Sequence, residues 1–310
     1  MTKHKGEGGL GRRAILECMA WAGTGTVWML AGGIPASRLL TGAQAATPGF
    51  SFVQLSDDHI GFNKEANPDV TGTLRRATAL VAKLPRKPDF IIHTGDVSHL
   101  SKPAELDLAR QVISELGIPL YVVPGEHDML IDDGATFRER FGQGTRGAGW
   151  FSFDHAGVHF VGLVNVVDLK AGGLGKLGDD QLAWLADDLM PQRSSTPIVV
   201  FAHIPLWTVY AEWGWGTDDG ARALALLARF GSVTVLNGHI HQVVQKIEGH
   251  IAFHTARSTG FPQPAPGTAP SPGPLKVPPD MLPSLLGLTD VTVVPGAERL
   301  ALVDHTLAAA

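Results

Sequence analysis

The stretch Leu55-Ser56-Asp57-Asp58-His59-Ile60-Gly61 places two carboxylates and an imidazole directly after a short apolar segment, residues 50–55. A run of this length and composition is typical of a buried β-strand. Side chains that follow such a strand lie at its carboxyl end, where open α/β sheets bind their ligands. The alternation Asp57-x-His59 also suits extended backbone, in which residues i and i+2 point the same way. This stretch therefore predicts a ligand site at one edge of a sheet.

Working outward along the chain, four further clusters follow other apolar segments: Gly95-Asp96, Gly125-Glu126-His127-Asp128, His203 and Gly238-His239-Ile240-His241. Each is a weak signal alone, because a Gly-Asp pair is common and a single histidine is usually packed or at the surface. Together they supply carboxylates and imidazoles, the ligand types of divalent transition metals, and a carboxylate can bridge two cations. Their order and shared position predict a metal site.

The rest of the chain alternates strand-like and helix-like segments, which predicts an α/β layered domain. The expected strands are residues 50–55, 90–93, 120–123, 198–202 and 233–236, with hairpins within 150–164, 243–255 and 291–303. The expected helices are residues 71–84, 103–116, 179–189 and 219–230. Residues 261–283 are rich in proline and are expected to be irregular, as a linker, a lid, an ordered wrap or a solvated loop.

The ordered set of clusters resembles the calcineurin-like metallophosphoesterase family. Residues 55–61, 123–128 and 237–241 are close to the usual sequence motifs of the family. The stretch Gln181-Leu182-Ala183-Trp184-Leu185 is similar to the family's helix between the third and fourth motifs. The resemblance covers roughly residues 50–255. It implies a four-layer α/β/β/α sandwich of two mixed sheets, and an enzyme that hydrolyses a small phosphate ester, either a monoester or a diester.

The resemblance also implies two divalent metal ions (Mn, Fe, Zn or Co) and a hydroxide between them that attacks phosphorus. One metal would take Asp57, His59, Asp96 and His241, and the other Asp96, Glu126, His203 and His239, so that Asp96 bridges the pair. His127 would be no ligand but would contact the phosphoryl group or protonate the leaving oxygen. Asp128 would either orient His127 or cap the loop.

Two positions depart from the family pattern. The family normally has Asn where this chain has Glu126, and the added charge should hold the second metal more tightly and reduce its Lewis acidity. His99 stands where one branch places an Asp that pairs with the catalytic histidine, and another branch places a Tyr ligand; it could reach the site or lie on the surface. The alternative function is a catalytically silent metal-binding protein of the same fold, although seven of the eight ligand positions match.

Two further features concern the substrate. The segment after His203 carries four large aromatic residues: Trp207, Tyr210, Trp213 and Trp215. Trp213 and Trp215 could stack on a nucleobase or cover an apolar leaving group, or the loop could pack on itself. His254 follows the last metal motif by one hairpin and could face the substrate.

The first 45 residues differ from the rest. A basic start with the pair Arg12-Arg13, an apolar stretch over residues 19–34 and the small-x-small site Ala43-Gln44-Ala45 resemble a twin-arginine signal peptide, although the residues flanking the arginines match loosely. This predicts recognition by the twin-arginine machinery, cleavage, and a periplasmic or secreted domain of residues 46–310 without a stable membrane span. An uncleaved membrane anchor is the alternative.

Charge and cysteine content restrict the partners of the expected mature domain. Residues 46–310 hold 20 basic and 28 acidic residues, a net charge of −8. Such a surface does not attract nucleic acid by charge alone. The only cysteine, Cys18, lies in the leader, so the mature domain needs no disulfide.

Overall fold

The computed structural model describes residues 26–31, 34–39, 49–294, 297 and 299–309. The chain divides into a unit of residues 1–48 and a unit of residues 49–310. In the first unit, strands β1 (Thr26–Ala31) and β2 (Ile34–Leu39) pair antiparallel. The arginine pair and the expected cleavage site lie outside the described residues, so the signal peptide stays a prediction. Among the described residues, no helix is long and apolar enough to cross a membrane.

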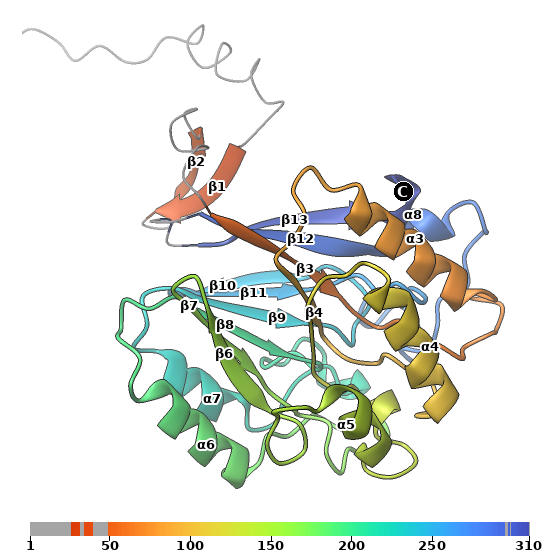
Figure 1. The fold of residues 1–310 in the computed structure, drawn as a ribbon, viewed down its shortest axis with the longest axis horizontal. Helices are drawn as coiled ribbons and strands as arrows, with labels where there is room; N and C mark the ends of the chain where they lie inside the picture. Colours follow the sequence, from red (N-terminus) through yellow and green to blue (C-terminus); the bar gives the residue numbers. More distant parts are fainter. Residues whose placement is uncertain (1–25, 32–33, 40–48, 295–296, 298, 310) are drawn as a thin grey trace, which may run out of the picture. The chain divides into compact units, whose positions relative to one another are not determined.

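The second unit contains two mixed sheets (Figure 1). The five-stranded sheet has the order β13-β12-β3-β4-β5, built from Ala301–Thr306, Gly287–Val293, Phe50–Leu55, Phe90–His93 and Leu120–Val122. The six-stranded sheet has the order β10-β11-β9-β8-β7-β6, built from Gln245–Glu248, Ile251–Thr255, Val233–Asn237, Ile198–Ala202, Val158–Gly162 and Phe151–His155. In both sheets the central strands run parallel, and antiparallel partners close the ends except at β5.

Helices cover the outer face of each sheet. Helices α3 (Val70–Ala82) and α4 (Pro103–Ser114) pack on the five-stranded sheet, and α6 (Asp179–Leu189) and α7 (Gly220–Leu227) pack on the six-stranded sheet. The short elements are α5 (Ala135–Phe141), α8 (Leu282–Leu285), η1 (Glu126–Asp128), η2 (Ala211–Trp213) and η3 (Leu307–Ala309). The predicted four-layer α/β/β/α architecture is confirmed, whereas α5 was not expected.

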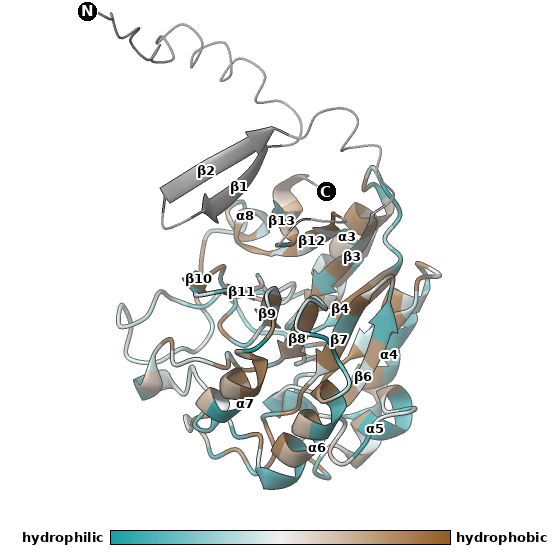
Figure 2. Ribbon diagram, turned by 90° about the vertical axis from the view of Figure 1, so that its left-hand side faces the viewer, coloured by the Kyte–Doolittle hydropathy of each residue, from teal (hydrophilic) through white to brown (hydrophobic). Residues whose placement is uncertain are grey.

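Aromatic side chains fill the space between the two sheets. Phe52 stacks on Phe90 with ring centroids 5.1 Å apart, and Phe160 from the other sheet meets Phe90 edge-on at 5.2 Å. Such pairs add to the stability that burial of their large apolar area supplies. Figure 2 shows the hydrophobic colouring of β8 and β9 in this interior. Because the sheets pack face to face, the loops that leave β3, β4, β8 and β9 meet at one edge: the His203 Nδ1–H donates to the Thr94 carbonyl at 2.7 Å.

The proline-rich segment begins against this edge. Residues 261–281 contain no helix or strand, as expected, whereas the last two residues of the segment predicted to be irregular, 282–283, begin α8. Phe261 is nevertheless buried, with its ring 4.4 Å from Phe62, 4.6 Å from His59 and 4.7 Å from His241 between centroids. Its carbonyl accepts a hydrogen bond from His241 Nδ1. The start of the segment is thus an ordered wrap over the metal motifs rather than a solvated loop.

Candidate metal centre

Five of the predicted ligands have backbone in the left-handed region, with φ between 46° and 69°: Asp57, His59, Asp96, His239 and His241. Such residues each cost on the order of 1–3 kcal/mol and persist only where their surroundings hold them. Here the loops hold each other, since the Asp57 N–H donates to the Gly95 carbonyl at 3.0 Å and the His59 N–H to the Asp96 carbonyl at 2.9 Å. The expectation of extended backbone at Asp57-x-His59 is therefore wrong, because interlocked turns aim these side chains.

The first group of donors surrounds a common point. His59 Nε2 lies 3.2 Å from His241 Nε2 and 3.5 Å from Asp96 Oδ2, and His241 Nε2 lies 3.3 Å from Asp57 Oδ1. A cation bound at 2.0–2.2 Å to two such atoms requires them to lie roughly 3–3.5 Å apart. These separations match that requirement.

A second group lies beside the first. Glu126 places Oε2 2.8 Å from His203 Nε2 and Oε1 3.1 Å from His239 Nδ1. The two imidazole nitrogens are 3.2 Å apart, and His203 Nε2 is 3.4 Å from Asp96 Oδ2. Asp96 Oδ2 therefore belongs to both groups, which is the position of a bridging carboxylate. The structure brings together all seven predicted metal-ligating residues.

Hydrogen bonds outside the groups orient the donor atoms. His203 and His241 use Nδ1–H to donate to the carbonyls of Thr94 and Phe261, at 2.7 and 2.5 Å, so each Nε2 turns a lone pair inward. Glu126 Oε2 is buried and, among the described residues, has no aligned hydrogen-bond donor. Converging lone pairs without protons are what a divalent cation satisfies. The residues thus fit two divalent metal ions, and a nitrogen and oxygen donor set without thiolate suits Mn, Fe, Zn or Co.

The electrostatics favour the metal-binding forms of Asp57, Glu126 and His59. They do not favour that of His203: burial would lower its pKa, but the charges of Asp96 and Glu126 raise it well above its ordinary value, so a metal must displace a proton there. Burial would raise the pKa of Asp57, but the neighbouring His241 and His203 lower it to about 2. Burial would also raise the pKa of Glu126, yet His239 and His203 hold it well below its usual range. Burial, together with the charges of His127 and His241, lowers the pKa of His59 far below its ordinary value. Ionised carboxylates and a neutral imidazole are the forms that bind metals.

His127 lies beside both groups. Its backbone N–H donates to Asp96 Oδ1 at 2.9 Å, and its ring Nδ1–H donates to the His99 carbonyl at 2.7 Å. The ring stacks on the His99 ring with centroids 4.8 Å apart and meets the His59 ring edge-on at 4.7 Å. Burial opposes protonation, but Asp96 and Glu126 raise the pKa of His127. Its Nε2 is the ring nitrogen left for a substrate.

The hydrogen bonds of Asp128 favour the loop-capping alternative over the orientation of His127. The buried oxygens of Asp128 accept hydrogen bonds from the backbone N–H groups of Val97, Ser98 and Gly125 and from the Ser98 hydroxyl, at 2.8–3.1 Å. Burial and the charge of Asp96 raise the pKa of Asp128 to about 6. The carboxylate therefore ties two loops together, which was the alternative considered, and the His99 carbonyl orients His127 in its place.

His99, whose position was open, reaches the centre. Its Nδ1 lies 3.3 Å from His59 Nδ1. Burial lowers the pKa of His99 to about 4, with further contributions from the charges of His127, Lys64 and Lys102. A neutral imidazole therefore stands where a carboxylate partner would stand in another branch. The position three residues after Asp96 was the signal that identified it.

The three predicted substrate residues do not face the metal groups. Trp213 and Trp215 are 8% and 1% exposed and form a small core with Ile240, the residue between His239 and His241. This burial matches the packing alternative, because a stacking platform needs an open indole face. The buried His254 imidazole lies 3.1 Å from Asp304 on β13, so this pair links the two sheets.

Sequence reasoning missed one buried polar pair behind the centre. Asp58 Oδ2 accepts from His93 Nε2 at 3.0 Å, and Asp58 Oδ1 accepts from the Thr259 hydroxyl at 2.5 Å. His93 Nδ1 in turn accepts from the Gly95 N–H at 3.2 Å, which fixes the proton on Nε2. The pair joins the loops after β3 and β4 to the segment before Phe261. The adjacent carboxylates Asp57-Asp58 were the only hint of it in the sequence.

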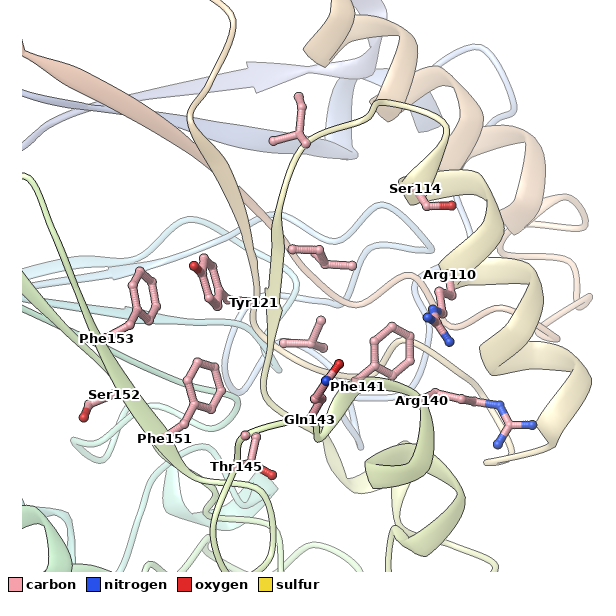
Figure 3. A pocket seen from close by; sticks show the side chains of 14 residues that line it. Arg110, Ser114, Tyr121, Arg140, Phe141, Gln143, Thr145, Phe151, Ser152 and Phe153 are labelled. Carbon is pink, nitrogen blue, oxygen red and sulfur yellow. The ribbon is translucent and has the colours of Figure 1, made fainter.

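A hollow of about 420 Å³ lies elsewhere, between β5, β6, α4 and α5 (Figure 3). Tyr121, Phe151 and Phe153 form its apolar side, and Arg110 and Arg140 stand at its other side. None of the residues that line it belongs to the metal groups. It supplies no metal-ligating cluster and is not the candidate active site.

Comparison with known proteins gives the class that this fold and site define. Residues 50–243 match the calcineurin-like phosphoesterase family. This match spans more than half of the chain, so the chain belongs to that family. The predicted family, and with it the hydrolysis of phosphate esters at a two-metal site, is confirmed.

Individual relatives fall within the same class. A probable glycerophosphodiester phosphodiesterase from Arcobacter nitrofigilis is 27% identical over 226 residues, which cover 66% of this chain and 77% of that protein. A probable cyclic nucleotide phosphodiesterase from Synechococcus is 28% identical, over 69% of this chain and 83% of that one. Among solved structures, a dimetal phosphatase from Danio rerio shares the fold with a TM-score of 0.62 at 13% identity, over 84% of this chain and 97% of that one.

Proposed function

We propose that the chain is a phosphodiesterase that uses two divalent metal ions. The shared position of Asp96 Oδ2, 3.5 Å from His59 Nε2 and 3.4 Å from His203 Nε2, carries this proposal. The similarity to two phosphodiesterases supports a diester rather than a monoester as the substrate. Two bound cations supply charge neutralisation at the phosphoryl oxygens and a water molecule of lowered pKa.

The residues of the chain position and protonate the substrate. His127 has its Nδ1 proton held by the His99 carbonyl, so only Nε2 can exchange a proton with a substrate oxygen. A protonated Nε2 would deliver its proton to the substrate oxygen as the P–O bond breaks, so that this oxygen leaves as an alcohol, as in general-acid catalysis. The hydrogen bond from the His127 N–H to Asp96 Oδ1 fixes that imidazole relative to the shared carboxylate.

Glu126 makes the two donor groups alike in charge. With Asp96 counted in each, both groups consist of two carboxylates and two imidazoles. An Asn at this position would leave the second group with a single charged ligand. We therefore propose that Glu126 raises the affinity of the second position for its metal, because affinity follows the number of charged ligands.

Hydrolysis assays on metal-reconstituted protein test the proposal. Bis(4-nitrophenyl) phosphate and 4-nitrophenyl phosphate would be offered with Mn²⁺, Fe²⁺, Co²⁺ or Zn²⁺, and bound metal would be measured in parallel. We expect close to two equivalents of metal and faster turnover of the diester. Failure to hydrolyse either ester with any of the metals would leave the silent metal-binding alternative, and less than about one equivalent would contradict the two-metal centre.

We also propose that the N-terminal segment directs export by the twin-arginine pathway to the periplasm or the exterior. The pair Arg12-Arg13, the apolar stretch and the site Ala43-Gln44-Ala45 support this. Replacement of both arginines by lysine should stop export of the protein in its native host, as measured by fractionation. Export at the normal level after this change would contradict the proposal.

A further inference from the structure

Exposed apolar side chains gather beside the metal centre. The described part of the chain has eight large hydrophobic residues that are exposed, and four of them stand on segments that lead to the centre. Leu100 (40% exposed) follows His99, Leu130 (57%) and Ile131 (60%) follow His127 and Asp128 in the chain, and Val167 (37%) follows Val166, whose apolar cluster Met129 packs against. We call these four residues the apolar rim. A contiguous patch of exposed apolar groups can mark a site where another molecule binds.

A single hydroxyl joins two parts of the rim to the catalytic loop. The Ser101 Oγ–H donates to the His127 carbonyl at 2.7 Å, and the same oxygen accepts from the Leu130 N–H at 2.8 Å. Leu100 precedes Ser101 in the chain. Leu100 and Leu130 therefore flank one hydrogen-bonded bridge, and that bridge ends on the backbone of His127.

The loops of the rim are held in place. The Leu100 N–H donates to Glu105 Oε2 at 2.8 Å, so its backbone is anchored to α4. Met129 packs against the cluster formed by Val164, Val166 and Ile204, so the segment before Leu130 contacts the core from which Val167 follows. These contacts order the backbone that exposes the apolar side chains. The contact of these side chains with water costs free energy, and a bound apolar group would recover it.

We propose that the apolar rim binds the apolar substituent of the substrate, so that the enzyme acts on amphiphilic phosphate esters with an alkyl or acyl chain. This inference rests on the proposed function. The rim is continuous with the loop of His127, which serves the leaving oxygen, and a chain attached to that oxygen extends over Leu100, Leu130 and Ile131.

A chain-length series tests the rim separately from the chemistry. Dialkyl phosphates from dimethyl to dihexyl, kept below their micelle-forming concentrations, would be assayed for alcohol release by gas chromatography. If only monoesters are hydrolysed, the matching alkyl phosphates replace them. We expect kcat/KM of the wild type to rise roughly twofold per methylene, which is less than the about fourfold that complete burial of a methylene gives.

Variants of the apolar rim test whether the rim causes the rise of kcat/KM with chain length. The double variant Leu130→Asn/Ile131→Asn should reduce the rise to below about 1.3-fold per methylene, with each slope taken relative to the same variant's rate on the methyl ester. Leu100→Gln, on the neighbouring loop, should lower the slope partly and serves as a second test if the double variant does not fold. The matched control is Met190→Gln: Met190 is 71% exposed but lies at the end of α6, and the slope should stay that of the wild type.

The outcomes are distinct. Hydrolysis of the methyl ester with no rise along the series would overturn the rim proposal and leave the proposed function intact, whereas no hydrolysis of any ester would contradict the proposed function itself. A slope unchanged in the double variant would also overturn the rim. A rise seen only when phosphatidylglycerol vesicles are added would overturn binding of a single substrate chain and indicate a membrane surface instead.

Discussion

The two donor groups of the metal centre have the same composition but different surroundings. In the first group, the side chains of Asp57, His59 and His241 are at most 2% exposed, and Phe261 packs against the two histidines. In the second group, His203 is fully buried, but Glu126 and His239 are 25% and 12% exposed. The burial of the first group should make it hold its metal ion tightly. The second group is more accessible to the substrate, and its metal ion should exchange more readily. We therefore expect stepwise metal binding, with the buried position filled first.

The largest effect should come from the residue that the groups share. Asp96→Asn removes the negative charge from both positions at once and should lower kcat by roughly 10³-fold or more, because several kcal/mol of charge stabilisation depend on the paired cations. Metal analysis should show at most one tightly bound ion. Two retained ions with near-normal turnover would show that the groups do not depend on Asp96.

Removal of the proton donor His127 should slow the chemical step and leave metal binding in both groups unchanged. His127→Gln keeps a side chain of similar length and should lower kcat by about 10²–10⁴-fold. The loss should be greater for a dialkyl phosphate than for bis(4-nitrophenyl) phosphate, since nitrophenolate leaves without a proton. Metal content should remain at two equivalents. Equal losses for both esters would refute the acid role.

Replacement of Glu126 by the Asn expected from the family should affect metal binding only in the second, more exposed group. Glu126→Asn should weaken the second metal by about 10- to 100-fold and leave the first unchanged, because the ligand charge falls only there. A two-step calorimetric titration of metal-free protein measures both affinities. An equal loss of affinity in both binding steps would show that the two groups do not bind their metals independently.

The smallest effect should come from a change at Phe261, which packs against the histidines of the first, buried group. Phe261→Leu keeps the backbone carbonyl that accepts from His241 but reduces the packing on His59 and His241. We expect the first metal to bind about tenfold more weakly, at the lower end of what supporting residues contribute. The second step of the same titration is the internal control, and weakening there instead would reverse the assignment of the two positions.

Much of this centre could be predicted from the sequence, because strand ends place side chains in a known location. The strand over residues 50–55 and the placement of His203 directly after β8 agree with the structure. The local backbone could not be predicted: the ligands stand on turns held by hydrogen bonds from distant loops. The partners of Asp128 and the burial of Trp215 likewise depend on segments far away in the chain, which periodicity does not reveal.

The left-handed backbone also restricts which amino acids can serve as ligands. Among residues with a side chain, Asp, Asn and His are enriched in this conformation, whereas Glu is not. The two carboxylate positions with positive φ, Asp57 and Asp96, therefore favour the shorter acid. Glu126 stands on η1, where φ is not positive, and it is the ligand position at which the sequence is expected to depart from the family pattern. We therefore expect ligand positions outside the left-handed region to vary most, and a search for altered relatives should begin at residue 126.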